Sequence, residues 1–75
     1  MEKNVRLRVL YVMELFVEQT DSEKGVTMQE ILDWLGEHDL TGERKSIYED
    51  IHALKEFGLD IRYTQSDKTY RLASR

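Results

Sequence analysis

Hydrophobic residues in the middle of the chain recur at helical spacing. The stripe that they form consists of Ile47, Ile51 and Leu54, with Phe57 at its edge. Spacings of four and three residues place these side chains on one side of a helix. Thr41 precedes the stripe as the expected N-cap, and Gly58 follows it where helices often end in a left-handed residue. We therefore predict an amphipathic helix over about 42–57.

A first helix is predicted from Lys3 to Gln19, where apolar residues occupy most of the helix circumference. We expect its core stripe to consist of Val5, Val9, Val12, Met13 and Phe16, extended by Leu10 and Val17. Leu7, Tyr11 and Leu15 form a continuous row on the other side. The row predicts a second contact surface, for a partner subunit or a following domain. Individually exposed Leu and Tyr side chains are the plainer alternative.

A capping box marks the start of a second helix. The Thr27 hydroxyl can cap the helix while Glu30, three residues on, reaches back to the Thr27 N–H. The helix is expected from Met28 to about Glu37, with Val26 and Thr27 forming a very short strand before it. Its expected core residues are Ile31 and Leu35, flanked by Met28, Leu32 and Trp34. Trp34 could instead be an exposed contact, but large aromatic side chains are mostly buried.

The segment that joins the second and third helices contains one apolar residue. This residue, Leu40, can fill the angle between the two helices. A helix, a short turn with an apolar plug and a capped helix form the helix-turn-helix arrangement.

After Gly58 the spacing of the apolar residues changes from helical to alternating. The alternating positions are Leu59, Ile61 and Tyr63 and, after the polar turn 65–68, Tyr70 and Leu72. This pattern predicts a β-hairpin, which must pack on the helices because an isolated hairpin is unstable in water. The predicted fold class is α+β, a winged helix-turn-helix with three helices and a C-terminal β-hairpin wing, as one domain over residues 1–75.

Composition narrows the class of function. The 75 residues suit one domain, and the absence of Cys excludes disulfides and thiolate metal sites. No apolar run approaches the roughly 20 residues of a membrane helix, and the N-terminus lacks a signal-peptide pattern. We therefore expect a cytoplasmic protein without membrane contact.

The formal net charge of −4 argues against nucleic-acid binding, which depends on a basic surface. The charge is unevenly distributed, however. Residues 1–40 contain four basic and nine acidic residues, a net −5, whereas residues 41–75 contain seven basic and six acidic residues, a net +1. The second half of the chain can therefore present a locally positive edge.

Arg44 and Lys45 place positive charge in the first turn of the third helix, where the helix dipole disfavours cations. A contact with phosphate would explain them. If this helix lies in a major groove, the residues able to reach base edges are Lys45, Ser46, Glu49 and His52. Backbone contacts are expected from Arg44, Tyr48 and Thr27, and Lys68 and Thr69 on the wing could contact the backbone or the minor groove. Ordinary solvated side chains are the alternative interpretation for each.

An enzyme is not expected. The histidines are His38, in a turn, and His52, on an outer helix face, and there is no Gly-rich phosphate loop or paired acid and base. We predict no cofactor, no metal site and no small-molecule site. The main alternative to DNA binding is a winged-helix protein-interaction or dimerisation module without strong DNA binding. The acidic net charge and the row of Leu7, Tyr11 and Leu15 favour this alternative.

The chain resembles the N-terminal winged helix-turn-helix of bacterial WYL-domain transcriptional regulators. The resemblance covers nearly the whole chain through RLRVLYVMELF, VTMQEILDWL, ERKSIYEDIHALKEFGLDI and TYRLASR. Its most specific part is the run Arg44-Lys45-Ser46-Ile47-Tyr48, followed by Asp50, Ile51, Leu54 and Gly58. Asp50 is expected to act inside the protein, with a partner that the sequence does not identify.

The resemblance implies sequence-specific binding of double-stranded DNA in transcription regulation. Members of the family usually continue from a similar YxLAS sequence into a ligand-binding WYL domain, so the chain is expected to be an excised DNA-binding domain. A small self-standing protein is the other interpretation. A homodimer or a following WYL domain are the implied protein partners. Two departures are Glu49, where many relatives carry Arg, and a short wing with the single lysine Lys68. Both weaken the implied DNA contacts.

Overall fold

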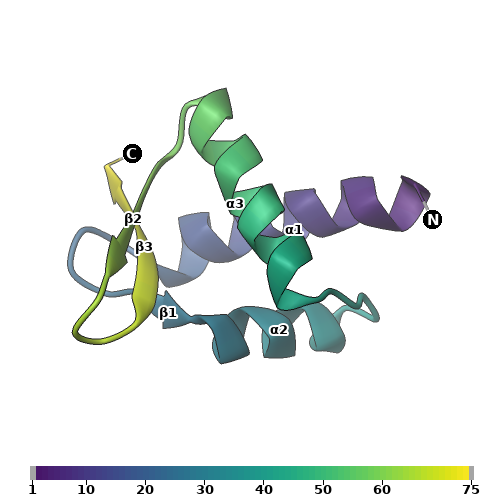
Figure 1. The fold of residues 1–75 in the computed structure, drawn as a ribbon, viewed down its shortest axis with the longest axis horizontal. Coiled ribbons are helices and arrows are strands. Elements are labelled where there is room, and N and C mark those ends of the chain that lie inside the picture. The colour runs from purple at the N-terminus through teal and green to yellow at the C-terminus, as the bar shows by residue number, and fades with distance from the viewer. Residues whose placement is uncertain (1, 75) are drawn as a thin grey trace.

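The computed structural model describes the backbone of residues 2–74 and the side chains of residues 5–74. The elements in chain order are α1 (Glu2–Gln19), β1 (Val26–Thr27), α2 (Met28–Glu37), α3 (Arg44–Phe57), β2 (Asp60–Thr64) and β3 (Thr69–Ser74). The three helices pack together and the small sheet closes one end of them (Figure 1). The predicted fold class, an α+β winged helix-turn-helix, is confirmed.

The sheet is antiparallel, in the order β1-β3-β2. In the hairpin, Tyr63 pairs with Tyr70, and Thr64 pairs with Thr69 beside the turn. On its other edge β3 pairs with β1, which places Val26 opposite Tyr70. The short strand β1 thus attaches the wing directly to the start of α2. Strand pairing between segments this far apart in the chain was not part of the prediction.

Gly25 permits this attachment, because its backbone runs very close to β3. A Cβ atom at this position would lie 2.7 Å from the carbonyl oxygen of Tyr70 and 2.9 Å from the hydroxyl of Thr69. Both distances are shorter than a carbon atom tolerates. The glycine is therefore required by the close approach of two backbones.

The buried stripe of α1 differs from the prediction. Val12, Leu15 and Phe16 are buried, whereas Val5, Leu10 and Val17 are exposed. Val9 and Met13, also predicted in the core, are only partly buried against it. The buried side continues to a charged residue, Arg8, instead of a further apolar one. The prediction is therefore correct for Val12 and Phe16 but wrong for Val5, Leu10 and Val17, because α1 has apolar residues around most of its circumference and their spacing does not fix the edges of the buried stripe.

The predicted capping box of α2 is confirmed. The Glu30 N–H donates to the Thr27 hydroxyl at 3.1 Å, and the Thr27 N–H donates to the Glu30 carboxylate at 2.8 Å. Trp34 lies at the edge of the core, as predicted, and its indole N–H donates to the Tyr11 carbonyl at 2.9 Å. At the other end, the N–H of Leu40 donates to the Leu35 carbonyl across a left-handed Asp39. This arrangement buries Leu40 between the helices, as expected of the plug.

The predicted N-cap of α3 is wrong. The helix begins at Arg44, and its N-cap is Glu43, whose side chain makes no capping hydrogen bond. Thr41 is exposed and lies before the helix. At Gly42 the chain packs instead against the Ile47 side chain. A Cβ atom added to this glycine would lie 3.1 Å from the Ile47 Cδ1 atom. The end of α3 is as predicted, because Gly58 has a φ of 130° and its N–H donates to the Leu54 and Lys55 carbonyls.

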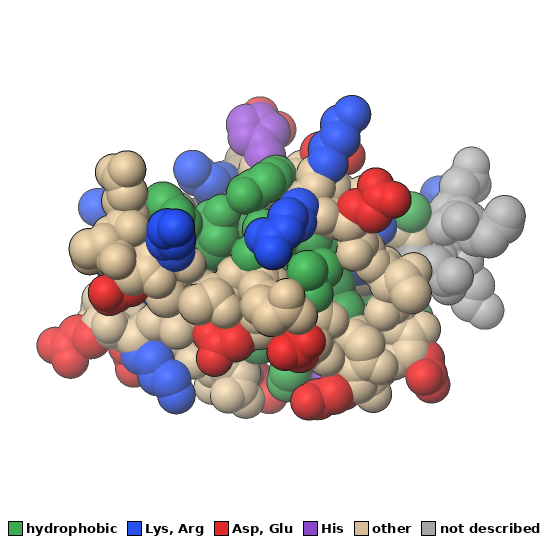
Figure 2. All heavy atoms as spheres, turned by 60° about the horizontal axis from the view of Figure 1, so that its bottom comes forward, with side chains coloured by type: hydrophobic (Ala, Val, Ile, Leu, Met, Phe, Trp, Pro, Cys, Tyr) green, Lys and Arg blue, Asp and Glu red, His purple; other side chains and the backbone are tan. Residues whose placement is uncertain are grey.

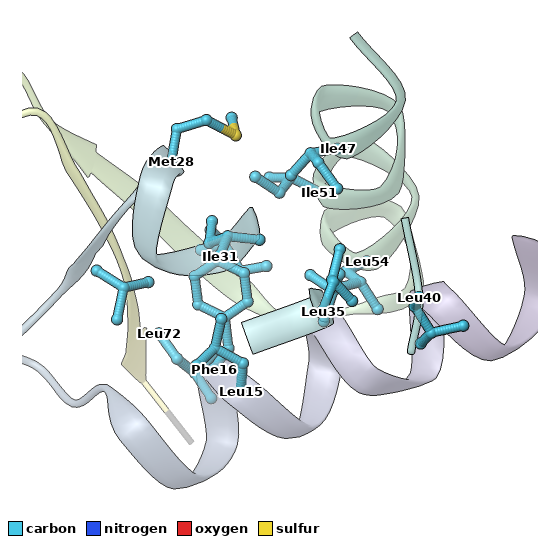
Figure 3. Packing of buried hydrophobic residues seen from close by; sticks show 13 residues of the cluster. Leu15, Phe16, Met28, Ile31, Leu35, Leu40, Ile47, Ile51, Leu54 and Leu72 are labelled. Atoms are coloured by element: carbon cyan, nitrogen blue, oxygen red, sulfur yellow. The ribbon is translucent and has the colours of Figure 1, made fainter. Parts of the chain in front are cut away.

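The core contains side chains from all three helices and the sheet. They point toward one another in Figure 3, with Phe16 and Ile31 near the centre. The α3 contribution, Ile47, Ile51 and Leu54, is as predicted, although Phe57 at its edge is 79% exposed. Ile61 and Leu72 from the hairpin are also buried. The wing is therefore anchored in the core, as an otherwise unstable hairpin requires.

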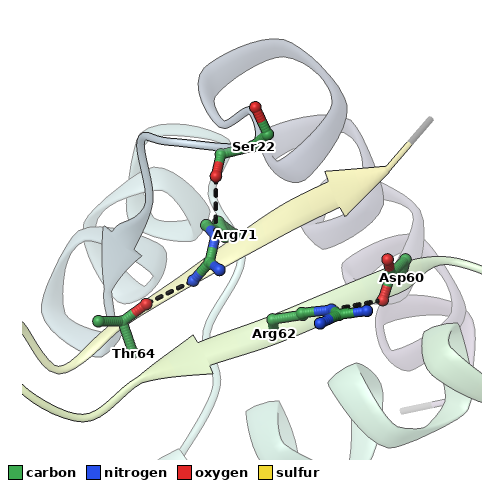
Figure 4. Close-up of polar contacts among 5 residues, drawn as sticks. All are labelled: Ser22, Asp60, Arg62, Thr64 and Arg71. Carbon is green, nitrogen blue, oxygen red and sulfur yellow. Dashed lines mark hydrogen bonds and ion pairs between the residues drawn. The ribbon is translucent and has the colours of Figure 1, made fainter.

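Two polar residues also connect the sheet to the end of α1. The buried Thr20 hydroxyl donates to the Phe16 carbonyl at 2.7 Å and accepts the N–H of Leu72 at 2.9 Å. Arg71 donates to the Ser22 carbonyl at 3.1 Å and to the Thr64 hydroxyl (Figure 4). Arg71 therefore has a structural role across the sheet.

An ion pair inside the protein joins α1 to α3. The Arg8 guanidinium donates to both carboxylate oxygens of Asp50, at 2.6 and 3.0 Å. Their side chains are 11% and 5% exposed. The hydrogen bond to Asp50 raises the pKa of Arg8 above its ordinary value, although burial opposes this shift. Asp50 thus acts inside the protein as predicted, and Arg8 is its partner.

Replacing Asp50 by Ala should lower the free energy of unfolding by about 3 kcal/mol, because Arg8 would remain desolvated without a partner. Urea denaturation followed by circular dichroism measures this. Asp60→Asn is the matched control, since the Asp60–Arg62 pair is exposed, and it should cost less than about 1 kcal/mol. Equal losses in the two variants would contradict the structural role of the buried pair.

Replacing Gly25 by Ala should destabilise the fold by about 1–3 kcal/mol, because the added methyl group overlaps the β3 backbone. Gly36→Ala is its control, since a Cβ there meets nothing within 4 Å. In the helix α2 this second change should stabilise the protein by about 0.5–1 kcal/mol. Thermal melting of both variants distinguishes the two effects, and a neutral Gly25→Ala would refute the close approach.

Candidate nucleic-acid interface

The structure brings predicted DNA-binding residues from three parts of the chain to one surface hollow of about 610 Å³. We call it the tyrosine hollow, and its lining residues are Thr27, Met28, Gln29, Arg44, Tyr48, Tyr63, Asp67, Lys68 and Tyr70. Four of these were predicted from the sequence: Thr27, Arg44, Tyr48 and Lys68. They come from the start of α2, the first two turns of α3 and the hairpin turn. The winged helix-turn-helix fold thus joins its three parts at this position.

Three tyrosines form the aromatic part of the hollow. The ring centroid of Tyr70, on β3, lies 4.7 Å from that of Tyr63 and 6.5 Å from that of Tyr48. Burial and a hydrogen bond with Tyr48 raise the pKa of Tyr70 far above its ordinary value, so its hydroxyl stays protonated. Tyr48 and Tyr63 are each about half exposed. The hollow therefore offers tyrosine hydroxyl groups and aromatic rings to whatever it contacts.

The charged side chains of the hollow are two cations and one anion. Arg44 is the first residue of α3, and Lys68 lies in the hairpin turn with a positive φ of 57°. Asp67, beside Lys68, partly offsets them. The field of Arg44 also acts on Tyr70, whose pKa it lowers slightly against the dominant effect of burial. The local balance is positive, unlike the net −4 of the whole chain.

Charges are also separated on the face of the molecule that includes α2. In Figure 2, hydrophobic side chains gather in the upper part of this face with Lys and Arg side chains beside them. Asp and Glu side chains follow mainly its lower edge. The structure therefore segregates charges that the sequence only divides between the two halves of the chain.

The start of α3 is less well compensated than a typical helix N-terminus, because only the charge of its N-cap residue, Glu43, is favourable there. It has no side-chain cap and no acidic residue in its first turn, where Arg44 and Lys45 stand instead. The start of α2, by contrast, is satisfied by its capping box. An external anion near Arg44 would complement both the helix dipole and the two cations.

The predicted base-reading residues lie on α3 beside the hollow. Lys45, Glu49 and His52 are exposed, whereas Ser46 is half-buried. His52 lies 3.3 Å from the Glu56 carboxylate, an exposed pair one helical turn apart. None of the four lines the hollow itself. They form the outer surface of a helix whose inner stripe is buried, as a helix that enters a groove requires.

Thr69 lies on the wing, as predicted, at the start of β3. It is half-buried and is paired with Thr27 on one side and Thr64 on the other. Arg62 and Arg71, which contributed to the positive balance of the second half, pair with Asp60 and with Ser22 and Thr64 respectively. Of the wing's cations, Lys68 is therefore the one that lines the hollow.

The predicted contact row on α1 is wrong as an exposed surface. Leu15 is 3% exposed and belongs to the core. Tyr11 is half-buried, with its ring centroid 4.4 Å from that of His38. Of the three residues only Leu7 is exposed. The row faces α2. The buried side of α1 includes part of this row, whereas the apolar spacing had placed the row on the opposite side of the helix.

Tyr63 and Tyr70 are site residues that the sequence analysis treated only as strand positions. A signal for them was present. Counting outward from the four-residue turn 65–68 pairs Thr64 with Thr69 and Tyr63 with Tyr70, as the structure does. Their meeting with Tyr48 depended on the packing of the hairpin against α3, which local spacing does not specify.

Among the residues that the structure describes, no group of three His, Cys, Asp or Glu side chains could hold a metal ion. His38 instead packs between the rings of Tyr11 and Trp34, with Nδ1 2.9 Å from the Trp34 carbonyl. Within the described part of the chain, no helix has the length and apolar character needed to cross a membrane.

Comparison with known proteins yields no relative: no family model, no curated protein and no solved structure matches this chain. The resemblance to WYL-domain regulators therefore stays a prediction from the sequence.

Proposed function

We propose that this chain binds double-stranded DNA sequence-specifically, as the DNA-reading domain of a bacterial transcriptional regulator acting in the cytoplasm. The observation that carries the proposal is the convergence at the tyrosine hollow. The start of α2, Arg44 and Tyr48 from α3, and Lys68 from the wing line one surface. These are the three parts of a winged helix that approach a duplex together.

In this proposal α3 enters the major groove, and the tyrosine hollow lies over the adjacent sugar-phosphate backbone. Arg44 and Lys68 supply positive charge to the phosphates, and the Tyr48 hydroxyl supplies a neutral hydrogen-bond donor. Such contacts position a protein on the duplex but do not read its sequence. Base reading would come from the exposed stripe of α3, where Lys45 can donate to guanine and Glu49 can accept from cytosine N4.

The acidic residues set the expected strength of binding. Two or three phosphate contacts correspond to a slope of about −2 to −3 in log affinity against log salt concentration. Glu49 and Asp67 oppose the phosphates, so the affinity of one domain for a random duplex should be modest. Affinity for a preferred sequence then depends on favourable contacts of Lys45 and Glu49 with particular bases.

A protein-interaction module is the second candidate function, and one observation favours it. Apolar side chains are exposed along α1, on residues outside the tyrosine hollow: Val5, Leu7, Leu10 and Val17. Since the two surfaces share no residue, an interaction through α1 is compatible with DNA binding. It would replace DNA binding only if the hollow had no affinity for phosphate.

The charges of the hollow provide the first test. Lys68→Ala should weaken binding to a labelled random duplex and reduce the salt slope by about 1. Asp67→Asn should strengthen binding, because it removes a negative charge beside the same phosphates. Fluorescence anisotropy at about 50 and 200 mM salt measures both effects, a range over which phosphate contacts weaken strongly. Lys24→Ala, in the loop before β1, is the control and should leave affinity nearly unchanged.

Binding that is absent even at low salt would refute the proposal. Equal losses for Lys68→Ala and Lys24→Ala would also count against it, since general electrostatic attraction would then explain binding without the hollow.

Base reading by α3 requires a separate test. A preferred duplex is first selected from a random pool with the parent chain. Lys45→Ala should then lose about 1–3 kcal/mol of discrimination at one base pair. Its circular dichroism melt should remain close to that of the parent, because Lys45 is exposed. Unchanged discrimination in the variant would remove Lys45 from the base-reading set.

A further inference from the structure

Two aromatic rings of the tyrosine hollow continue the inner face of the hairpin beyond the core. Ile61 is paired with Leu72, and Tyr63 is paired with Tyr70 two positions nearer the turn. Side chains two positions apart on a strand point to the same side of a sheet. Ile61 and Leu72 are buried, whereas Tyr63 is 50% exposed and Tyr70 is half-buried. The tyrosine pair therefore occupies the part of this face that the helices leave partly open to solvent.

Contacts with the phosphates of a duplex do not account for the exposed ring of Tyr63. A phosphate is bound by cations and hydrogen-bond donors, which Arg44, Lys68 and the Tyr48 hydroxyl already supply. The bases of a duplex are stacked on one another and present only their edges in the grooves. An aromatic ring at the surface of the domain therefore cannot stack on them, and the face of Tyr63 is left unused.

The rings are held in place by contacts with one another. Tyr70 lies between the other two, with its ring centroid 4.7 Å from that of Tyr63 and 6.5 Å from that of Tyr48. A hydrogen bond also joins Tyr48 to Tyr70. The hollow of about 610 Å³ lies within the range of roughly 300–1,000 Å³ that is usual for sites of small organic groups. It can therefore receive a flat ring as well as a phosphate.

Two cations line the same hollow as the rings. Arg44 comes from the start of α3 and Lys68 from the hairpin turn, so the rings have positive charge on two sides of the chain's fold. Proteins that bind single-stranded nucleic acid combine the same two features. Unpaired bases stack on aromatic side chains, and basic side chains follow the sugar-phosphate backbone.

We propose that the tyrosine hollow binds single-stranded nucleic acid, with one unpaired base stacked on the exposed face of Tyr63 and the adjoining phosphates beside Arg44 and Lys68. Every base has an aromatic face, so this contact selects the unpaired state of the strand more than its sequence. Asp67 lines the hollow beside Lys68 and opposes the phosphates. Binding should therefore be modest and should weaken as the salt concentration rises.

This binding uses the same two cations as the proposed contact with duplex phosphates, so one hollow cannot hold both ligands at once. It does not rest on the duplex proposal, however. Stacking requires the ring of Tyr63, whereas the duplex contact requires only charges and hydroxyl groups. Base reading by Lys45 and Glu49 is likewise not needed, since a single strand has no major groove. The two proposals can therefore fail separately.

Fluorescence anisotropy with a labelled thymidine oligomer of about ten nucleotides, which does not pair with itself, tests the proposal at about 50 mM salt. Tyr63→Leu should weaken binding of this oligomer at least about fivefold, because it removes the stacking ring but keeps an apolar side chain beside Tyr70. Tyr63→Phe retains the ring and should bind within about twofold of the parent. Neither change should alter the affinity for a duplex of the same length by more than about twofold.

Two controls make the test specific. Phe57→Leu removes an aromatic ring that is 79% exposed but lies outside the hollow, and it should leave the affinity for the oligomer unchanged. An abasic oligomer with the same number of phosphates requires no change in the protein. It should bind the parent at least about fivefold more weakly than the thymidine oligomer, and it should bind Tyr63→Leu and the parent alike. Circular dichroism melts check that each variant is folded.

A free nucleotide offers the same base and phosphate as a strand, so thymidine monophosphate is included as a competitor. It should displace the labelled oligomer only at a concentration at least about tenfold above that of the unlabelled oligomer, because it lacks the adjoining phosphates. Displacement at equal concentrations would overturn the strand as the ligand and assign the hollow to a free nucleotide.

The other contradicting results are distinct. A thymidine oligomer that does not bind at millimolar chain concentration overturns the inference, and so does equal binding of the thymidine and abasic oligomers. Equal affinities of Tyr63→Leu and Phe57→Leu exclude stacking on Tyr63. If duplex binding persists in these cases, only the inference fails. Oligomer binding that depends on Tyr63, without any duplex binding, would instead leave the inference standing and overturn the proposed function.

Discussion

The buried pair of Arg8 and Asp50 is the constraint on which the arrangement of the helices depends. Two charges inside a small core are tolerated only when they are matched, and here the match is bidentate, at 2.6 and 3.0 Å. The pair determines how α3 is rotated about its axis. Residues two apart on a helix lie about 200° apart around it, so a buried Asp50 turns Tyr48 outward, toward the hairpin. A structural contact on one side of α3 thereby positions a candidate DNA contact on the other.

The tyrosine hollow shows how a small fold assembles a site from distant segments. Gly25 lets β1 approach β3, and this pairing places the start of α2 beside the wing. Tyr70, on the central strand, then contacts Tyr63 within the sheet and Tyr48 on α3. Each step depends on backbone packing, so the site is built on rigid elements. Only Lys68 and Asp67 lie on a turn.

The net charge of the chain does not describe the local charge of its surfaces, because the fold separates basic from acidic residues. The chain carries −4 overall, yet Arg44 and Lys68 both line the hollow, while α1 exposes a mainly apolar surface beside Glu14 and Glu18. Arg62 and Arg71 are paired with other groups, Asp60 and the Ser22 carbonyl respectively, and neither lines the hollow. Two surfaces with different chemistry are thus present on 75 residues.

The sequence by itself determined the elements whose signals are local. The capping box of Thr27 and Glu30, the stripe of Ile47, Ile51 and Leu54, the left-handed Gly58 and the alternating hairpin each depend on residues a few positions apart. The winged helix-turn-helix order follows from them, and so do four lining residues of the hollow. The buried face of α1, the true start of α3 and the meeting of the three tyrosines were decided only by the tertiary structure. The physical reason is clearest at Arg8, whose burial makes sense only beside a carboxylate 42 residues away, and no periodicity within a single helix encodes a partner at that distance.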